Sequence, residues 1–290
     1  MRWLDAAATR QSLPMAAAIE AMEVAFGDDR ETPLRTLLGR SLFMPGRAGG
    51  HTGVKVVSVV PGNPVGIVVV FDRDGSPLGM VDGPTLTSIR TGAACGLATR
   101  LLSRSEAGVL AMLGAGAMAF DQVEAVRAVR DIRRVLVWSR SPGRARALAT
   151  RVNGEVVADA ETAIRLADIV SCATPAREPL FADSSLQPGT HINAVGAFTP
   201  EMREVPAETV HRAYVVVDDL EAAAAEAGDL IQAEREPVCT IGDVLAGRHP
   251  QIGEDVTLFK SVGIASQDVA AAAVALDYAG KKGLGVRLGP

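Results

Sequence analysis

The sequence has few of the residues that form disulfide bonds or bind metal ions. Among its 290 residues are only three cysteines and four histidines, at Cys95, Cys172, Cys239, His51, His191, His211 and His249. The cysteines are odd in number and far apart, which argues against a disulfide framework and a CxxC metal site. The histidines are equally scattered, so they indicate no zinc-ligand cluster. We expect no metal ion, and a protein that folds in a reducing cytoplasm.

The sequence also lacks a basic patch and a long apolar run. Its formal net charge is -5, and no basic stretch has interleaved aromatics, which argues against nucleic-acid binding. The longest apolar run, residues 107–120, is too short to span a bilayer. The N-terminus has no basic segment followed by an apolar core. We expect a soluble protein with no membrane partner, and its 48% hydrophobic residues supply an ample core.

A glycine-rich turn interrupts the apolar run. In LAMLGAGAMA (residues 110–119) an apolar strand stops at a glycine and leads into GAGAMA. Such a strand-to-helix turn presents backbone amides to a pyrophosphate. The residues that we expect at a dinucleotide are Gly114, Ala115, Gly116, Ala117 and Met118. A GxGxxA turn without any ligand is the alternative, but the flanking strand, helix and second strand favour the dinucleotide site.

The first hundred residues predict an antiparallel sheet with helices. A helix is expected over residues 12–27, with Ser12 as its N-cap and Gly27 as its end. β-rich runs follow at 54–60, 65–71 and 77–81, with a hairpin turn at 72–76, and a helix is expected at 86–103.

Beyond residue 108 strands and helices alternate. Strands are expected at 109–113, 134–138, 155–158, 169–173, 191–195 and 214–217, and helices at 117–129, 143–152 and 160–167. This alternation is typical of a doubly wound parallel sheet, the Rossmann α/β fold. A final helix at 266–280 returns to the first domain, which is therefore expected to be discontinuous.

The end of the second strand indicates the cofactor. An acidic residue there binds the ribose hydroxyl of NAD(H), whereas this sequence has Ser139, Arg140 and Ser141, with Arg144 one turn later. Hydroxyls and guanidinium groups suit a 2′-phosphate. We expect a preference for NADP(H), with NAD(H) possible; the alternative is that both arginines are solvated surface charges.

Three further segments are expected beside the nicotinamide half. Thr174 ends one strand, and Val195 and Gly196 end the next, at the carboxyl edge where such sheets bind ligands. The FKSVG segment before the last helix adds Val262 and Gly263.

Several segments, taken together and in order along nearly the whole chain, resemble the ornithine cyclodeaminase/μ-crystallin family. They are PLRT (33–36), GVKVVSVVPGNP (53–64), LTSIRTGAACGLAT (86–99), GAGAMA (114–119), VWSRS (137–141), INAVGAFTPEMRE (192–204), AGDLIQA (227–233) and LFKSVGIASQDVAAA (258–272).

The resemblance implies a domain plan and a chemistry. A Rossmann domain (105–262) is expected to be inserted into an α+β substrate-binding and dimerisation domain (1–104 and 263–290). Members form homodimers through the sheets of their N-terminal domains. They move hydride between nicotinamide and the α-carbon of an amino or imino acid.

The resemblance also implies site residues. Arg35, Lys55 and Arg90 match the family's substrate-carboxylate clamp, and Asp229 matches the acid that exchanges a proton. Arginine forks and a lysine charge suit a carboxylate, and a tuned carboxylate can act as a base. The alternatives are a solvated Lys55, a surface Arg90, and an Asp229 that caps a helix beginning near residue 230.

Two positions depart from the family pattern. Met118 stands where the glycine turn commonly has glutamine, and Leu42 stands where ornithine cyclodeaminases place an acidic residue. Leu42 therefore argues against ornithine, and the loops around Leu42 and Phe198 are expected to form the pocket walls.

Three functions stay open on these residues. The first is an NADP(H)-dependent amino acid dehydrogenase or cyclic ketimine reductase, in which Lys55 and Asp229 are catalytic. The second is an ornithine- or lysine-type cyclodeaminase with catalytic NAD(P). The third is an NADPH-binding protein without turnover.

Overall fold

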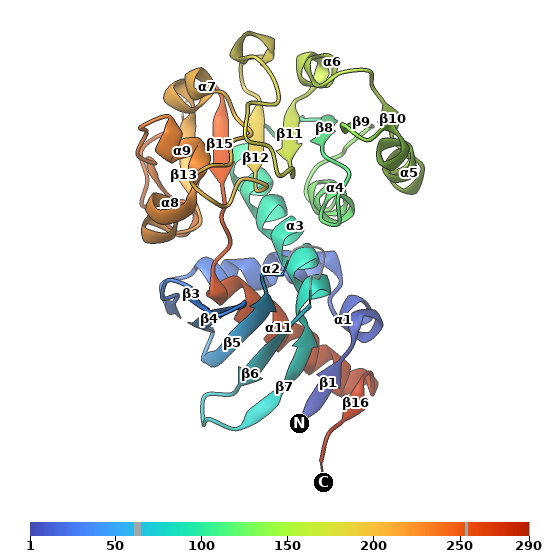
Figure 1. The fold of residues 1–290 in the computed structure, drawn as a ribbon, viewed down its shortest axis with the longest axis vertical. Helices are drawn as coiled ribbons and strands as arrows, with labels where there is room; N and C mark the ends of the chain where they lie inside the picture. The colour runs from blue at the N-terminus through green and yellow to red at the C-terminus, as the bar shows by residue number, and fades with distance from the viewer. Residues whose placement is uncertain (61–64, 253–254, 290) are drawn as a thin grey trace. The chain divides into compact units, whose positions relative to one another are not determined.

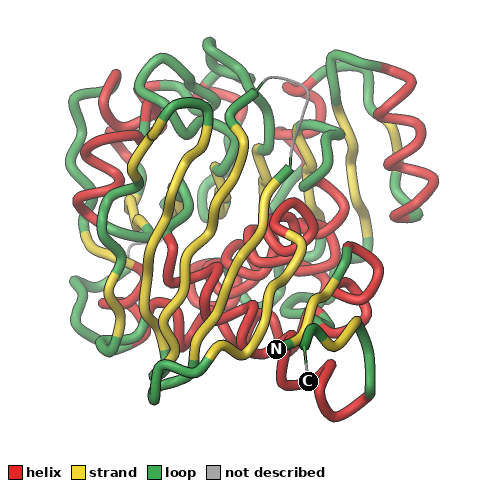
Figure 2. Tube along the Cα trace, turned by 60° about the horizontal axis from the view of Figure 1, so that its bottom comes forward, coloured by secondary structure: helices red, strands yellow, loops and turns green. Residues whose placement is uncertain are grey.

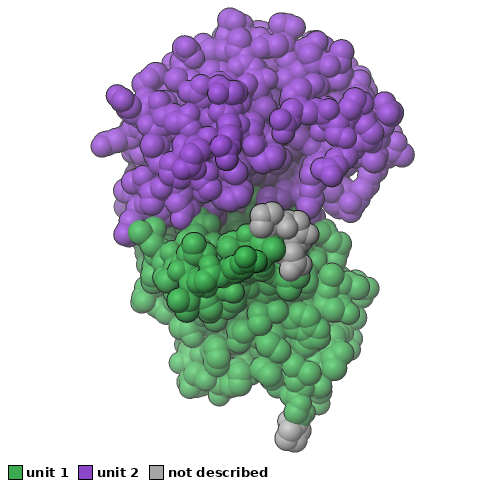
Figure 3. All heavy atoms as spheres, viewed as in Figure 1, with its two compact units in different colours: residues 1–93, 264–290 green, residues 94–263 purple. Residues whose placement is uncertain are grey.

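The computed structural model describes residues 1–60, 65–252 and 255–289, so the last four residues of GVKVVSVVPGNP lie outside the described residues. The chain forms two compact units, one of residues 1–93 and 264–290 and one of residues 94–263 (Figure 3). The division between them falls inside a helix, at residues 93 and 94, and not after that helix.

The first unit contains a sheet of eight strands. They are β1 (Arg2–Leu4), β2 (Arg30–Glu31), β3 (Thr36–Leu38), β4 (Ser41–Ala48), β5 (His51–Ser58), β6 (Gly66–Phe71), β7 (Pro77–Asp82) and β16 (Val286–Arg287). Their order is β16-β1-β7-β6-β5-β4-β2, with β3 beside β4. The pairs from β4 to β7 are antiparallel, as expected from the sequence. In the turn between β6 and β7 the Asp72 carboxylate accepts hydrogen bonds from the amides of Asp74 and Ser76.

The helices α1 (Ala6–Ser12), α2 (Met15–Phe26) and α11 (Ala265–Lys282) belong to the first unit, together with the first part of α3 (Gly83–Leu102). The single helix expected at 12–27 is wrong at its start. Helix α1 ends at Ser12, and Pro14 interrupts the helical segment before α2 begins. The end at Gly27 is confirmed.

Helix α11 covers one face of this sheet at close range (Figure 1). Three strand glycines allow it: a Cβ at Gly46 would lie 2.7 Å from the Cβ of Ala265, one at Gly79 would lie 2.6 Å from Leu276 Cδ2, and one at Gly53 would lie 3.1 Å from Val269 Cγ2. Strand side chains alternate between faces. The other face of the sheet lies in front in Figure 2, with no helix of the described chain across it.

The second unit contains a parallel sheet of eight strands. They are β8 (Val109–Leu113), β9 (Arg134–Trp138), β10 (Glu155–Val156), β11 (Ile169–Cys172), β12 (His191–Ala194), β13 (Tyr214–Val217), β14 (Cys239–Thr240) and β15 (Thr257–Lys260). Their order is β10-β9-β8-β11-β12-β15-β13-β14. From β8 the chain adds β9 and β10 on one side of the sheet, and then adds β11 and the later strands on the other side. The boundary between β8 and β11 is therefore the switch point of a doubly wound fold. The α/β class is confirmed, although strand β15, which lies between β12 and β13, was not predicted from the sequence.

Helices connect the strands of this second unit. They are α4 (Ala119–Arg127), α5 (Pro142–Val152), α6 (Ala160–Leu166), α7 (Ala207–Arg212), α8 (Leu220–Glu226), α9 (Gly228–Gln232) and α10 (Ile241–Leu245), with a single 3₁₀ turn at Asp183–Ser185. Helix α4 begins two residues later than expected, because the glycine turn continues through Met118.

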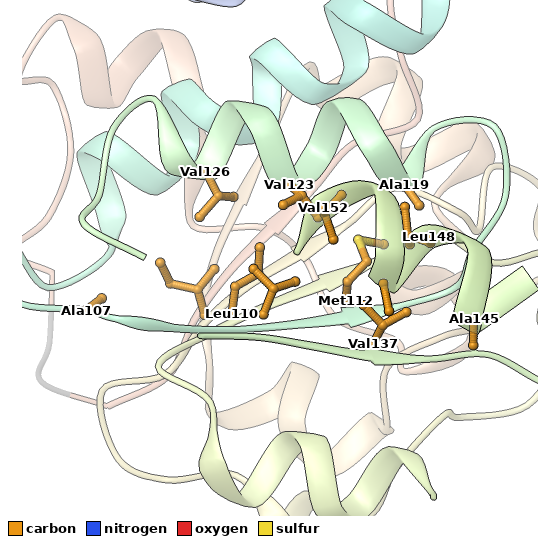
Figure 4. Close-up of a cluster of buried hydrophobic side chains, with 13 residues drawn as sticks. Ala107, Leu110, Met112, Ala119, Val123, Val126, Val137, Ala145, Leu148 and Val152 are labelled. Atoms are coloured by element: carbon orange, nitrogen blue, oxygen red, sulfur yellow. The ribbon is translucent and has the colours of Figure 1, made fainter. Parts of the chain in front are cut away.

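The core of this unit lies between β8, β9 and the helices α4 and α5. Leu110 and Met112 of β8 and Val137 of β9 meet Val123 and Val126 of α4 (Figure 4), and all five are fully buried. Burial of each such side chain contributes roughly 1.5–3 kcal/mol to folding, which holds the strand end before the glycine turn in place.

Cys95, Cys172 and Cys239 are buried free thiols. No helix in the described part of the chain is long and apolar enough to cross a membrane.

Candidate active site

Five strands of the parallel sheet end in register. Leu113 pairs with Trp138 and Cys172, Cys172 pairs with Ala194, and Ala194 pairs with Lys260. The residues that follow these five strands therefore meet at one edge of the sheet. This is the edge where doubly wound sheets bind ligands.

The glycine turn is built for close backbone approach at this edge. Gly114 has a φ of 111°, a conformation that favours glycine, and a Cβ there would lie 2.6 Å from the carbonyl oxygen of Ala173. Gly116 and Ala117 are exposed just before α4 begins. A Cβ at Gly116 would meet no protein atom within 4 Å. The turn thus offers an open space at a helix N-terminus, which suits a pyrophosphate; Met118 lies at the N-cap position and forms no side-chain cap.

The residues expected at the adenosine ribose follow β9. Ser139 accepts a hydrogen bond from the Ser141 amide at 3.3 Å. Arg140 and Arg144 are exposed, and neither forms a hydrogen bond or ion pair with another residue of the described ranges. Their guanidinium groups are therefore available to a phosphate beside Ser139.

Thr174, Val195 and Gly196 follow β11 and β12 at the same edge. The Val195 amide donates to the Cys172 carbonyl, so the two strand ends stay joined beyond the sheet. The amides of Val262 and Gly263 donate to the carboxylate of buried Asp218 at 3.0 and 2.7 Å. These two hydrogen bonds hold the segment after β15 in place.

A cluster of buried charges in the first unit contains two of the predicted clamp residues. Lys55 on β5 and Arg90 on α3 are each only 5% exposed, so the solvated alternatives are wrong for both. The Lys55 Nζ lies 2.9 Å from Asp268 Oδ2, and the Arg90 Nε lies 3.0 Å from Asp268 Oδ1. Arg90 also donates to Gln267 Oε1 at 2.8 Å. One carboxylate in the first turn of α11 thus orients both cations.

Positive charge exceeds negative charge in this cluster. Burial lowers the pKa of Lys55 to about 8; Asp268 opposes this shift, while Arg90 and Arg35 add to it. Burial would raise the pKa of Asp268, but Arg90 and Lys55 outweigh it and hold that pKa below its usual value. Two buried cations therefore share one carboxylate, and the charge of Arg35 also acts on Lys55; this excess of positive charge favours an incoming anion.

Asp229 lies in the second unit, in a separate buried cluster. It is wholly buried in the first turn of α9, whose N-cap is Ala227, so the capping alternative is wrong. Its Oδ1 accepts the amides of Glu204 and Val205 at 2.7 and 2.9 Å, and its Oδ2 lies 2.8 Å from Lys260 Nζ. Lys260 is buried at the end of β15 and also donates to the carbonyl of Ala197.

Four polar residues that organise these clusters were not assigned from the sequence. They are Glu204, Lys260, Gln267 and Asp268, and all are buried. Lys260 ends the strand TLFK, and Asp268 stands among alanines and valines. A charged side chain at such an apolar position was the available signal.

The described residues contain no group of three or more His, Cys, Asp or Glu that could hold a metal ion.

The switch-point edge and the open glycine turn define a dinucleotide-binding α/β protein, and the excess of positive charge around Lys55 and Arg90 suits an anion. The sequence matches the model of the ornithine cyclodeaminase/mu-crystallin family over residues 21–283. The chain belongs to this family.

Known relatives and structures agree with this assignment. The chain is 38% identical to a Delta(1)-pyrroline-2-carboxylate reductase of Bacillus cereus over 289 residues, covering 89% of each chain. Its fold matches the Delta(1)-pyrroline-2-carboxylate reductase of Thermococcus litoralis in complex with NADH and L-proline, with a TM-score of 0.92 and 31% identity. The match covers 99% of this chain and 100% of the other. It also matches an archaeal alanine dehydrogenase dimer with bound NAD, with a TM-score of 0.92, 30% identity and coverage of 100% and 99%.

Proposed function

We propose that this chain is an NADP(H)-dependent oxidoreductase that reduces a small cyclic imino acid to the amino acid. The observation that carries the proposal is the cluster of Lys55 and Arg90 on one carboxylate, with the charge of Arg35 nearby. This excess of positive charge suits the carboxylate that every α-imino acid carries. The relative at 38% identity is named a reductase of a substrate of this kind.

In this proposal each chemical task of the reduction is assigned to a residue. Arg35, Lys55 and Arg90 hold the substrate carboxylate, and Asp268 keeps Lys55 and Arg90 in position. The nicotinamide, when bound, supplies the hydride that the imine carbon accepts. The ring nitrogen needs one proton, and we assign proton exchange at that atom to Asp229. Lys55 contributes a second acidic group, since a pKa of about 8 suits proton donation near neutrality.

Leu42 supports a cyclic imino acid over a diamino acid. On β4, Met44 pairs with Lys55 and Leu42 pairs with Val57, so Leu42 lies on the same face of the sheet as Lys55. An apolar side chain here suits a ring of methylene groups, and it offers no partner to a second amine.

Turnover assays separate the candidate functions. We expect NADPH consumption with Delta(1)-pyrroline-2-carboxylate, and formation of proline. Release of ammonia from L-ornithine or L-lysine with catalytic NAD(P)+, without net cofactor reduction, would identify a cyclodeaminase instead. Tight NADPH binding without either reaction would identify a binding protein.

The preference for NADP(H) rests on the two unpaired arginines beyond β9. Replacement of Arg140 by alanine is expected to raise the KM for NADPH about tenfold, since one charged contact to a phosphate is lost, with little change for NADH. Steady-state kinetics with both cofactors measures this. Arg133→Ala, which removes another exposed arginine of the second unit, is the matched control. A wild-type preference for NADH of more than tenfold would contradict the assignment.

We also propose a homodimer that forms through the uncovered face of the first unit's sheet. Because Lys55 and Gly53 face α11, the alternate residues Val54, Val56, Ile67, Val69 and Met80 face away from it. All five are apolar and only half-buried. A second copy of the chain is the occupant that fits such a face, and an archaeal protein of the same fold is described as a dimer.

Replacement of Val69 by lysine at the centre of this face is expected to give monomers, because a charge buried in an apolar interface is costly. Light scattering coupled to size-exclusion chromatography measures the mass. Val156→Lys, at an exposed valine on β10, is expected to leave the dimer intact. A Val69→Lys protein that stays dimeric would show that the interface lies elsewhere.

We place the protein in the cytoplasm. The three cysteines are all buried and free, which suits a reducing compartment.

A further inference from the structure

Glu204 joins the ends of two neighbouring strands with a single side chain. It lies between β12 and α7 and is wholly buried. Its Oε1 accepts hydrogen bonds from the amide and hydroxyl of Thr174, at 2.6 and 2.8 Å. Its Oε2 accepts from the amides of Gly196 and Ala197, at 2.7 and 3.2 Å. Four donors from the segments after β11 and β12 therefore converge on one carboxylate.

The backbone of Glu204 is itself fixed by the neighbouring buried ion pair. Asp229 accepts the Glu204 amide, Lys260 pairs with Asp229, and Lys260 donates to the carbonyl of Ala197. Ala197 closes the network, because its amide donates to Glu204 and its carbonyl accepts from Lys260. It thus ties the ends of β11, β12 and β15 together below the edge that carries the expected cofactor contacts.

The two segments that Glu204 joins are packed against each other without spare room. A Cβ at Gly196 would lie 2.2 Å from the Thr174 carbonyl oxygen and 2.6 Å from Glu204 Oε1. The position of Thr174 relative to Gly196 therefore depends on the hydrogen bonds to Glu204. Loss of these bonds would leave the strand ends joined by the bond from the Val195 amide to the Cys172 carbonyl, but would release Thr174 and Gly196 beyond it.

The four donors favour the ionised form of the carboxyl group, because three of them are backbone amides, which cannot accept the hydrogen of a protonated oxygen. Burial raises the pKa of Glu204 to about 7; Lys260 on β15 opposes this shift and Asp229 on α9 adds to it. Cys172 at the end of β11 also faces the group, and burial raises the pKa of that thiol well above its usual value. Buried His191, with a pKa lowered to about 3, stays neutral.

We propose that Glu204 is a positioning residue for the dinucleotide: its carboxylate holds Thr174 and Gly196 in the arrangement that the nicotinamide half requires, and protonation of the carboxyl releases them. This inference rests on the proposed function, because it assumes that a nicotinamide dinucleotide binds at this edge. The residue acts through the two segments and does not touch the reacting atoms.

The dissociation constant of NADH, measured by fluorescence titration of the wild-type protein between pH 6 and pH 8, tests the inference. NADH is the probe because the 2′-phosphate of NADPH itself titrates near pH 6. A group with a pKa of about 7 is ionised to roughly 90% at pH 8 and roughly 10% at pH 6. The affinity for NADH is therefore expected to be about five- to tenfold weaker at pH 6.

Glu204→Gln imitates the protonated side chain. At pH 8 it is expected to bind NADH as weakly as the wild type does at pH 6, and to show no dependence on pH. Glu204→Asp keeps the charge but is too short for all four bonds, so its binding is weaker and still depends on pH. Glu178→Gln removes the charge of an exposed side chain four residues after Thr174. It is the control that is expected to bind NADH like the wild type.

The outcomes are separable. A wild-type dissociation constant that is equal at pH 6 and pH 8 overturns the inference whether or not the variants fold. A Glu204→Gln protein with a lower melting temperature but wild-type affinity assigns Glu204 a structural role only, and also overturns it. Absence of NADH binding at any pH overturns the proposed function together with the inference.

Discussion

Replacement of Lys55 by methionine is expected to lower kcat/KM for the imino acid by about 100- to 1,000-fold, the usual effect of truncating one partner of a buried charge contact. The affinity for NADPH is expected to stay within about twofold, because the residues that we assign to the cofactor belong to the second unit. Asp268 keeps Arg90 as a partner in the variant, so no carboxylate is left alone. Steady-state kinetics and NADPH titration measure the two effects.

The same lysine predicts a dependence on pH. Because the pKa of Lys55 is lowered to about 8, its charge is present below pH 8 and is lost as the pH rises through that value. The KM for the imino acid is expected to increase from pH 7 to pH 9. Lys55→Arg keeps the charge at every pH, so its KM is expected to stay flat over this range. A wild-type KM that does not change would show that Lys55 does not bind the substrate carboxylate.

Replacement of Lys260 by methionine is expected to destabilise the protein by about 3–5 kcal/mol, because it leaves Asp229 buried without a counter-ion. For a unit of this size the loss corresponds to a fall in melting temperature of roughly 10 °C. Differential scanning fluorimetry measures it.

The double variant Lys260→Met/Asp229→Asn provides the control. Asparagine can still accept the amides of Glu204 and Val205 through its oxygen, and the unpaired charge is gone. Most of the lost stability is expected to return. A double variant less stable than Lys260→Met alone would show that the ion pair is not what Lys260 contributes.

Local patterns in the sequence were sufficient for the glycine turn and for most strands of the parallel sheet, but not for β14 and β15. Strands β8, β9 and β11 are short runs rich in apolar residues, and Gly114 follows the first of them directly. Strand β4 was missed because Pro45 and Gly46 interrupt its pattern. In the structure it pairs with β5 along its whole length, and Gly46 is needed where Ala265 approaches.

The family resemblance pointed to Lys55, Arg90 and Asp229, but not to the groups that hold them. Asp268 is distant in sequence from both Lys55 and Arg90, and Glu204 meets Thr174 only because β11 and β12 are neighbours. Such contacts depend on the packing of whole elements, which no local pattern contains. The same limit explains why the burial of Asp229 beside Lys260 could not be foreseen.

The strand glycines beneath α11 have a consequence for the chemistry. Gly46, Gly53 and Gly79 let the helix layer lie close to the sheet layer. An aspartate has one methylene group, and it reaches Lys55 on the sheet only because this spacing is small. A methyl group added at Gly46, where a Cβ would lie 2.7 Å from the Cβ of Ala265, would act as a spacer between the layers and withdraw the carboxylate from the lysine. The charge state of the proposed substrate clamp is therefore set in part by residues that carry no side chain.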